Sequence, residues 1–221
     1  MTERPILFSA EMVRAILDGR KTQTRRAIKP VPTFNGGGAC HDADALQQDY
    51  VEPYWVFPKL CKYGAPSDLL WVRETFCAHW GAPPHDAPQS YRIATGDELP
   101  PIKQENGALY QPAPSDIMTI WYAAQGDKPF HMAWRPSIHM PRWASRITLR
   151  ITDVRVEMLQ DISEDDARAE GVSRTDWEYA DGECCDTDRE AFSNLWNRIN
   201  GPGAWDANPW VWVISFERVK P

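Results

Sequence analysis

GRKTQTRR, at residues 19–26, is the most informative stretch of this sequence. It directly follows a predicted helix that has Ser9 as its N-cap and Gly19 as its C-terminal stop, with apolar residues recurring between them at helical spacing. After that helix the chain should continue as a loop or extended segment, until Pro30 interrupts it. The stretch therefore places several polar and charged side chains beside a helix end.

Three side chains of this stretch can carry chemistry. Lys21 precedes the hydroxyl of Thr24 by three residues and Arg26 follows, so we expect an amine, a hydroxyl and a guanidinium within one tight turn. Like charge from the neighbouring arginines disfavours the ammonium form of Lys21, which could then act as a base. A hydroxyl near such a lysine is a candidate nucleophile. The structural alternative is a basic, exposed turn after a helix.

The same stretch resembles the signature of the ASCH family, which usually reads Gly-x-Lys-x-x-Glu-x-Arg after the first helix. Gly19, Lys21 and Arg26 match this pattern, and Thr24 stands where the general pattern has Glu. Small bacterial ASCH proteins that hydrolyse 4-acetylcytidine share the Lys-x-x-Thr arrangement and also use a Glu on a later helix. The resemblance indicates that Glu170, at the end of a predicted acidic helix, is that residue.

The resemblance implies a fold. Residues 69–76, 134–146 and 205–213 are similar to segments of ASCH proteins found in phages and prophages. We therefore expect an α+β fold, with a small PUA-like mixed β-barrel and flanking helices. A single domain should span residues 1–221, with irregular insertions at residues 33–66 and 80–114, where glycine and proline are frequent.

The implied activity is metal-independent amide hydrolysis, which removes an acyl group from the exocyclic amine of a modified cytidine. Lys21 would deprotonate Thr24, whose oxygen attacks the acyl carbonyl. Glu170 would orient the leaving amine or a water, and Arg26 or a backbone N–H would stabilise the oxyanion. A helix-end carboxylate paired with a nearby arginine is the structural alternative for Glu170.

Candidate binding residues come from two further segments. Residues 134–146 interleave aromatic and basic side chains, which is typical of surfaces that stack on bases and contact phosphates. Strand alternation should place Trp71 and Arg73 on one face and Glu74 on the other. Ordinary cation–π pairs or a strand with one salt bridge are the structural alternatives. The candidates for substrate binding are Arg26, Trp71, Arg73, Trp134, Arg135, His139, Arg142 and Trp143.

Hydrophobic periodicity and turn residues predict the remaining elements. Strands are expected at residues 5–8, 69–76, 91–94, 117–123, 146–156 and 210–219. Ser163 and Gly171 should bound a helix over residues 164–170. A further helix over residues 189–199 should direct four apolar side chains to the core: Phe192, Leu195, Trp196 and Ile199.

The formal net charge of −7 argues against a protein that coats nucleic acid non-specifically, but the charge is unevenly distributed. Residues 1–29 and residues 131–155 each carry a net charge of +4, whereas residues 157–190 carry −10. Two basic patches and one acidic lobe suit local steering of an anionic ligand. The structural alternative is that these are solvated faces.

Composition and motifs exclude several classes of protein. The chain has 221 residues, of which 43% are hydrophobic and 25% charged, as in globular proteins. No apolar run approaches the roughly 18 residues of a membrane span, and residues 1–7 do not resemble a signal peptide. The five cysteines form neither a disulfide framework nor a paired zinc motif, and there is no glycine-rich phosphate loop. We expect a cytoplasmic protein with no metal, no cofactor, no membrane association and no evident protein partner.

Two other functions stay open at this point. A non-catalytic module that binds RNA or a modified base would use Lys21, Arg26 and residues 134–146, and the eleven tryptophans favour it because they enlarge a recognition surface. A ribonuclease, an activity also reported in the ASCH family, would use Lys21 and the arginines to stabilise a scissile phosphate. The pairing of Lys21 with Thr24 favours the hydrolase, because a binding module needs no nucleophile.

Overall fold

The computed structural model describes residues 1–28, 61–83, 91–103, 109–126, 132–174 and 185–219. Most of the predicted insertion at residues 33–66 lies outside these ranges. By its internal contacts the chain divides into two compact units. The first comprises Met1–Thr2, Ala15–Leu69 and Arg150–Arg218, and the second comprises Glu3–Arg14, Leu70–Leu149 and Val219–Pro221.

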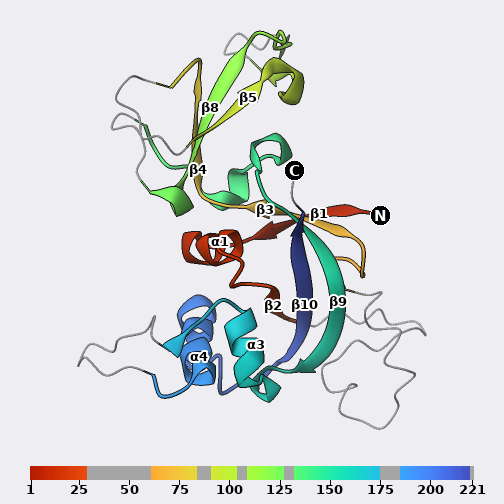
Figure 1. The fold of residues 1–221 in the computed structure, drawn as a ribbon, viewed down its shortest axis with the longest axis vertical. Helices are drawn as coiled ribbons and strands as arrows, with labels where there is room; N and C mark the ends of the chain where they lie inside the picture. Colours follow the sequence, from red (N-terminus) through yellow and green to blue (C-terminus); the bar gives the residue numbers. More distant parts are fainter. Residues whose placement is uncertain (29–60, 84–90, 104–108, 127–131, 175–184, 220–221) are drawn as a thin grey trace, which may run out of the picture. The chain divides into compact units, whose positions relative to one another are not determined.

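The largest sheet has five strands in the order β1-β3-β9-β10-β2 (Figure 1). Its members are β1 (Glu3–Leu7), β3 (Leu69–Arg73), β9 (Thr148–Met158), β10 (Trp210–Val219) and β2 (Gln23–Ala27). β10 pairs with β2 in the antiparallel sense, with Ile214 opposite Thr24. Four consecutive residues of β10, Val211–Ile214, are buried, as expected for an interior strand covered on both faces.

The described residues contain three α-helices, and the two later ones begin at a capped residue. α1 (Ala10–Leu17) follows Ser9. In α3 (Glu164–Ala169) the hydroxyl of Ser163 accepts a hydrogen bond from the amide of Asp166. In α4 (Asp188–Asn200) Thr187 accepts in the same way from the amide of Glu190. α3 packs against α4 and also contacts β2, the strand that follows Lys21.

The second unit contains a three-stranded sheet in the order β4-β8-β5. Its strands are β4 (Phe76–Trp80), β8 (Ile117–Tyr122) and β5 (Tyr91–Thr95), and β6 (Ile102–Lys103) and β7 (Leu109–Tyr110) form a separate pair. One face of the sheet packs into a core that includes Phe76, Ile120, Tyr122, Met140 and Ala144. Single 3-10 turns occur at Gly96–Glu98, Ala123–Gln125, Ser137–His139, Arg142–Ala144 and Leu159–Asp161.

The mixed α+β class is confirmed, and so are most of the predicted elements. Three expectations are wrong. The predicted strand at residues 69–76 is two strands, β3 and β4, interrupted at Glu74 and Thr75. Residues 80–114, expected to be irregular apart from a strand at residues 91–94, contain that strand as β5 and also the short strands β6 and β7. Ile199 is 55% exposed and does not face the core, because it lies in the last turn of α4.

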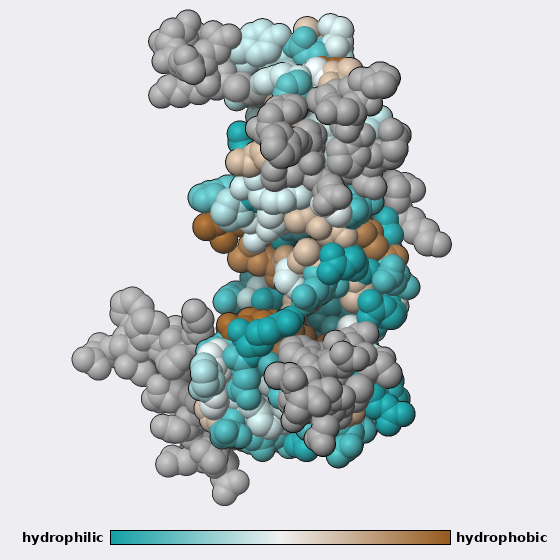
Figure 2. Space-filling model, turned by 90° about the vertical axis from the view of Figure 1, so that its left-hand side faces the viewer, coloured by the Kyte–Doolittle hydropathy of each residue, from teal (hydrophilic) through white to brown (hydrophobic). Residues whose placement is uncertain are grey.

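A few large apolar side chains reach the surface, among them Leu7, Trp80, Leu109 and Ile138. On the face drawn in Figure 2, hydrophobic residues appear in brown among hydrophilic residues in teal. Isolated exposed apolar residues are normal for folded proteins. None of the helices within the described ranges has the length and apolar character needed to cross a bilayer.

Candidate functional site

The sequence suggested a tight turn at residues 19–26, and this expectation is wrong. The stretch instead leads into strand β2. The amide of Lys21 donates to the carbonyl of Ala15 at the end of α1 (3.0 Å), and the amide of Thr22 donates to the carbonyl of Ala169 in α3 (2.8 Å). Lys21 also forms an isolated antiparallel bridge with Glu170. The backbone of Lys21 is therefore fixed between the ends of two helices.

The side chains of Lys21 and Glu170 meet in the interior of the first unit. Lys21 Nζ donates to Glu170 Oε2 at 2.8 Å and to the backbone carbonyl of the same residue at 2.8 Å. The two side chains are 0% and 3% exposed. Burial lowers the pKa of Lys21, against the opposing effect of the Glu170 charge and hydrogen bond, and Arg26 and Arg25 lower it further. The neutral, basic form of the amine is therefore more accessible than in a solvated lysine.

Arg25 is the centre of a wider network around this pair. Its Nη1 donates to Glu170 Oε1 (3.3 Å) and to Gln23 Oε1 (2.6 Å). Its Nη2 donates to Asp166 Oδ2 (3.1 Å) and to the carboxylate of Glu157. The side chain of Arg25 is fully buried. Through these hydrogen bonds Arg25 links Glu170 to the carboxylates of Asp166 and Glu157.

The network ends at a partly exposed arginine. Arg155 Nη2 donates to both carboxylate oxygens of Asp166 (3.0 and 3.1 Å), and its Nε donates to Glu157 Oε2 (3.0 Å). Burial acts to raise the pKa of Asp166, but the hydrogen bond from Gln23 and the charges of Arg25 and Arg155 together lower it. The result is a chain of alternating charges that runs from buried Lys21 to Arg155, which is 36% exposed.

Thr24 and Arg26 occupy the other positions of β2. Thr24 is 3% exposed, and strand alternation places it with Arg26 on the face opposite Gln23 and Arg25. Burial lowers the pKa of Arg26, although the charges of Tyr63 and Glu170 oppose this. The structure brings Lys21 and Glu170 into contact and shows no hydrogen bond from either to the hydroxyl of Thr24, all three lying within the described ranges.

The other predicted binding residues lie in the second unit. Arg73 lies over the ring of Trp71 (5.5 Å), which confirms their shared face. Trp134 packs with Cys77 and Trp121, and Trp143 packs against the core of the β4-β8-β5 sheet. The remaining three are exposed, with Arg142 paired to Glu3 (2.7 Å): Arg135, His139 and Arg142.

Sequence reasoning missed a buried ion pair in the second unit. Arg146 donates from Nε and Nη2 to both oxygens of Glu74 (2.9 and 3.0 Å), and its guanidinium lies 3.9 Å from the centre of the Tyr122 ring. The hydroxyl of Tyr122 donates to the carbonyl of Ala144 (2.8 Å). Burial raises the pKa of Glu74, and the Arg146 pairing opposes this. The signal in the sequence that could have indicated this ion pair was the predicted orientation of Glu74, on the strand face opposite Trp71 and Arg73.

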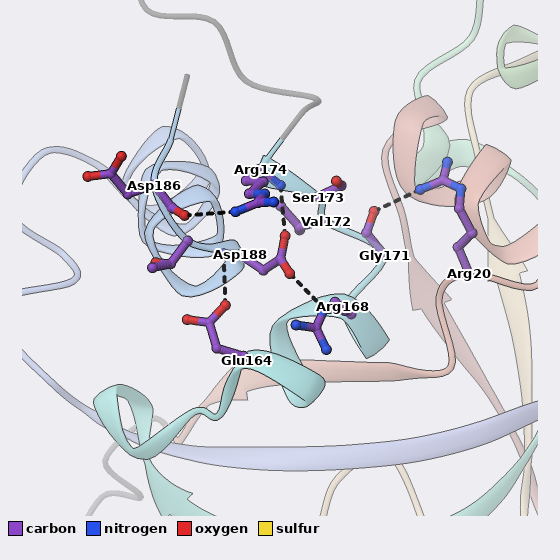
Figure 3. Close-up of a pocket in the computed structure, with 10 residues that line it drawn as sticks. Arg20, Glu164, Arg168, Gly171, Val172, Ser173, Arg174, Asp186 and Asp188 are labelled. Atoms are coloured by element: carbon purple, nitrogen blue, oxygen red, sulfur yellow. Dashed lines mark hydrogen bonds and ion pairs between the residues drawn. The ribbon is translucent and has the colours of Figure 1, made fainter. Parts of the chain in front are cut away.

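A pocket of about 770 Å³ lies beside α3 and the start of α4 (Figure 3). Its charged side chains are bonded to one another: Arg168 Nε donates to Asp188 Oδ2 (2.7 Å), and the amide of Arg174 donates to Asp188 Oδ1 (2.9 Å). Arg20 reaches the carbonyl of Gly171 at its edge (3.1 Å). Lys21, Thr24 and Glu170 do not line this pocket, so it is separate from the candidate catalytic residues.

The described residues contain no group of three or more His, Cys, Asp or Glu side chains arranged to hold a metal ion. Comparisons of the chain with protein-family models, with curated proteins and with solved structures give no match.

Proposed function

We propose that this protein is an ASCH-type amidohydrolase that removes an acyl group from the exocyclic amine of a modified cytidine. The observation that carries the proposal is the buried contact between Lys21 Nζ and Glu170 Oε2. These residues are 149 positions apart in the sequence. The resemblance to ASCH proteins indicates both residues as catalytic on the sequence alone.

The burial of Lys21 supports its role as the general base. A lysine transfers protons efficiently near neutral pH only when its surroundings disfavour the ammonium form. Burial and two neighbouring arginines disfavour the ammonium form of Lys21 here. Glu170 supplies the counter-charge, so that a protonated Lys21 is not an isolated charge in the interior. A Lys–Glu pair of this kind is suited to moving a proton and then returning it.

In the proposed reaction, neutral Lys21 takes the proton of the Thr24 hydroxyl while the Thr24 oxygen attacks the acyl carbonyl carbon. The C–N bond then breaks, and the Lys21 ammonium returns its proton to the departing exocyclic amine. A water oriented by Glu170 hydrolyses the acyl-threonine ester and releases the carboxylic acid. Arg26, which shares a strand face with Thr24, would stabilise the oxyanion. The Lys21–Thr24 contact would form with bound substrate, because catalytic hydrogen bonds often tighten only in the complex.

We further propose that the five-stranded sheet is the core of a small PUA-like β-barrel. In the strand order of this sheet, β10 lies between β9 and β2, and β2 is an edge strand. The segment that begins at Lys21 therefore leads into that edge strand. α3 contacts β2 and carries Glu170 at its C-terminal end. An experimental structure that shows β1 and β2 hydrogen-bonded to each other would establish the closed form.

The test is chromatographic detection of cytidine after incubation of the purified protein with 4-acetylcytidine. We expect release by the wild-type protein, strong loss in Lys21→Ala and Thr24→Ala, and substantial retention in Thr24→Ser, which keeps a hydroxyl. Thr22→Ala is the matched control, because Thr22 lies in the same segment with an exposed side chain. It should hydrolyse the substrate like the wild type.

Circular dichroism of each variant separates loss of chemistry from loss of folding. Equal inertness of the folded wild-type, Lys21→Ala and Thr24→Ala proteins toward several acylated cytidines would contradict the proposal. The chain would then be studied as a module that binds RNA or a modified base, by titration with these same ligands.

A further inference from the structure

We propose that Arg25 is a positioning residue of the candidate site, which holds the carboxylate of Glu170 so that Oε2 faces Lys21. The inference rests on the proposed function, since it assigns Arg25 a role in the same reaction. Arg25 has no part in the pattern that identified Lys21, Thr24 and Arg26. Its assignment comes from the contacts of its side chain alone.

The two oxygens of Glu170 have different partners. Oε2 receives the hydrogen bond from Lys21 (2.8 Å), whereas Oε1 receives one from Arg25 (3.3 Å). A carboxylate held by a single partner can rotate about its last torsion, which is broad. A second donor on the other oxygen restricts that rotation. Arg25 therefore fixes the orientation of the Glu170 carboxylate relative to the amine of Lys21.

Arg25 is itself held firmly enough to do this. Its guanidinium bonds to four acceptors, one from Glu170 and the others from Gln23, Glu157 and Asp166. It also lies 5.9 Å from the centre of the Phe192 ring on α4. The planar, forked guanidinium can satisfy carboxylates in several directions at once, which an ammonium group cannot do in this geometry. Lysine is therefore a poor substitute for Arg25.

The same contacts connect Lys21 to charges beyond its own partner. Within the described residues, the charges that act on Lys21 include those of Glu170 at the end of α3 and, from β2, Arg25 and Arg26. Those that face Arg25 are Glu170 and Asp166 on the α3 side and Glu157 on β9. Loss of the Arg25 charge should favour the ammonium form of Lys21. Loss of the Asp166 charge leaves Arg25 less neutralised and should favour the neutral amine.

The experiment compares the pH dependence of deacylation in Arg25→Lys, Arg25→Gln and Asp166→Asn. Because the rate depends on neutral Lys21, it should rise with pH. We expect the midpoint of that rise to move by roughly one pH unit to higher pH in Arg25→Gln, and to lower pH in Asp166→Asn. Arg25→Lys keeps the charge but loses the fork, so it should keep the midpoint and lose roughly tenfold in kcat, with KM nearly unchanged.

Arg150→Gln is the matched control, because Arg150 also lies on the five-stranded sheet but its pair with Glu217 is exposed. Its profile should coincide with that of the wild type. Shifts of opposite sign are the decisive feature, since general structural damage would not reverse direction between two variants. Superimposable profiles for wild type and Asp166→Asn, or shifts of the same sign, would overturn the inference.

A substrate-free measurement separates this inference from the proposed function. The ¹⁵N shift of the Lys21 amine, followed by NMR against pH in ¹⁵N-lysine-labelled protein and assigned with Lys21→Met, reports its protonation directly. If the wild type hydrolyses no acylated cytidine and the opposite shifts are still seen at Lys21, the proposed reaction fails while the role of Arg25 stands. An unchanged Lys21 titration in folded Asp166→Asn and Arg25→Gln proteins, together with an unchanged kcat in Arg25→Lys and normal hydrolysis by the wild type, would remove the role of Arg25 alone.

Discussion

Gly171 lies directly against Lys21. A Cβ atom added to Gly171 would lie 2.8 Å from Lys21 Cβ and 2.9 Å from Ala15 Cβ, both closer than real Cβ contacts allow. The backbone of Gly171 also has a φ of +80°, in the left-handed region that favours glycine. Both the conformation and the available space therefore require glycine next to the candidate base.

Gly171→Ala should therefore destabilise the protein more than the backbone conformation alone explains. Gly19→Ala is the matched control, because Gly19 has a φ of +76° and no atom within 4 Å of its added Cβ. We expect about 1 kcal/mol for Gly19→Ala and about 2–3 kcal/mol for Gly171→Ala, measured by urea unfolding. Equal losses in the free energy of unfolding would show that Lys21 moves away from the added methyl group without a measurable loss of stability.

The Lys21–Glu170 pair should be strongly coupled in stability. Glu170→Gln leaves a buried amine without its counter-charge, and Lys21→Met leaves a buried carboxylate with Arg25 alone. Each single change should cost about 3–5 kcal/mol in the free energy of unfolding. The double variant should cost clearly less than the sum, because neither charge then remains unpaired. Additive losses in a double-mutant cycle measured by denaturant unfolding would argue against a direct interaction.

Glu74 should make stability fall as pH rises. Burial raises the pKa of Glu74, so the folded protein binds this proton more tightly than the unfolded chain does. The resulting stabilisation is present below the unfolded pKa, near pH 4, and is lost as pH rises through the folded pKa. The free energy of unfolding of the wild type minus that of Glu74→Gln should therefore decrease from about pH 4 upward. A difference that is constant with pH would contradict this assignment.

Tyr122 should contribute through both its ring and its hydroxyl. Tyr122→Phe removes the hydrogen bond to the Ala144 carbonyl and should cost about 1 kcal/mol. Tyr122→Leu also removes the aromatic face beneath Arg146, 3.9 Å away, and should cost about 1–2 kcal/mol more. Thermal unfolding of both variants measures the two contributions. A smaller loss for the leucine variant than for the phenylalanine variant would rule out a stabilising cation–π contact.

Local signals in the sequence were enough to place several elements. Helix α3 was expected between Ser163 and Gly171; its N-cap is Ser163, and it ends at Ala169, with Glu170 as its C-cap and Gly171 directly after. β10 was expected at residues 210–219 and has those bounds, because a long apolar run beyond a glycine-rich turn has few alternatives. For α3 and β10, the residues that determine the bounds of the element lie within it or directly beside it in the sequence.

Other features depend on partners that are distant in sequence. The interruption at Glu74 separates β3 from β4, although residues 69–76 show no glycine or proline. There the amide of Glu74 points to Met140 Sδ (3.5 Å), a contact with a residue 66 positions away. Arg25 likewise finds its carboxylates at separations of 132, 141 and 145 residues. No local pattern distinguishes such a buried arginine from a solvated one, so the network around it could not be predicted.

The pairing of β10 with β2 sets the order in which the candidate site can be assembled during translation. Thr24 is hydrogen-bonded into the sheet by a strand that reaches its position at Ile214, near the end of the chain. Lys21, Thr24 and Arg25 therefore leave the ribosome long before the residues that hold their strand in place exist. Until residues 211–215 have emerged, this segment cannot pair with β10, and the nascent chain carries the charges of Lys21 and Arg25 in contact with water although both side chains are buried in the folded protein.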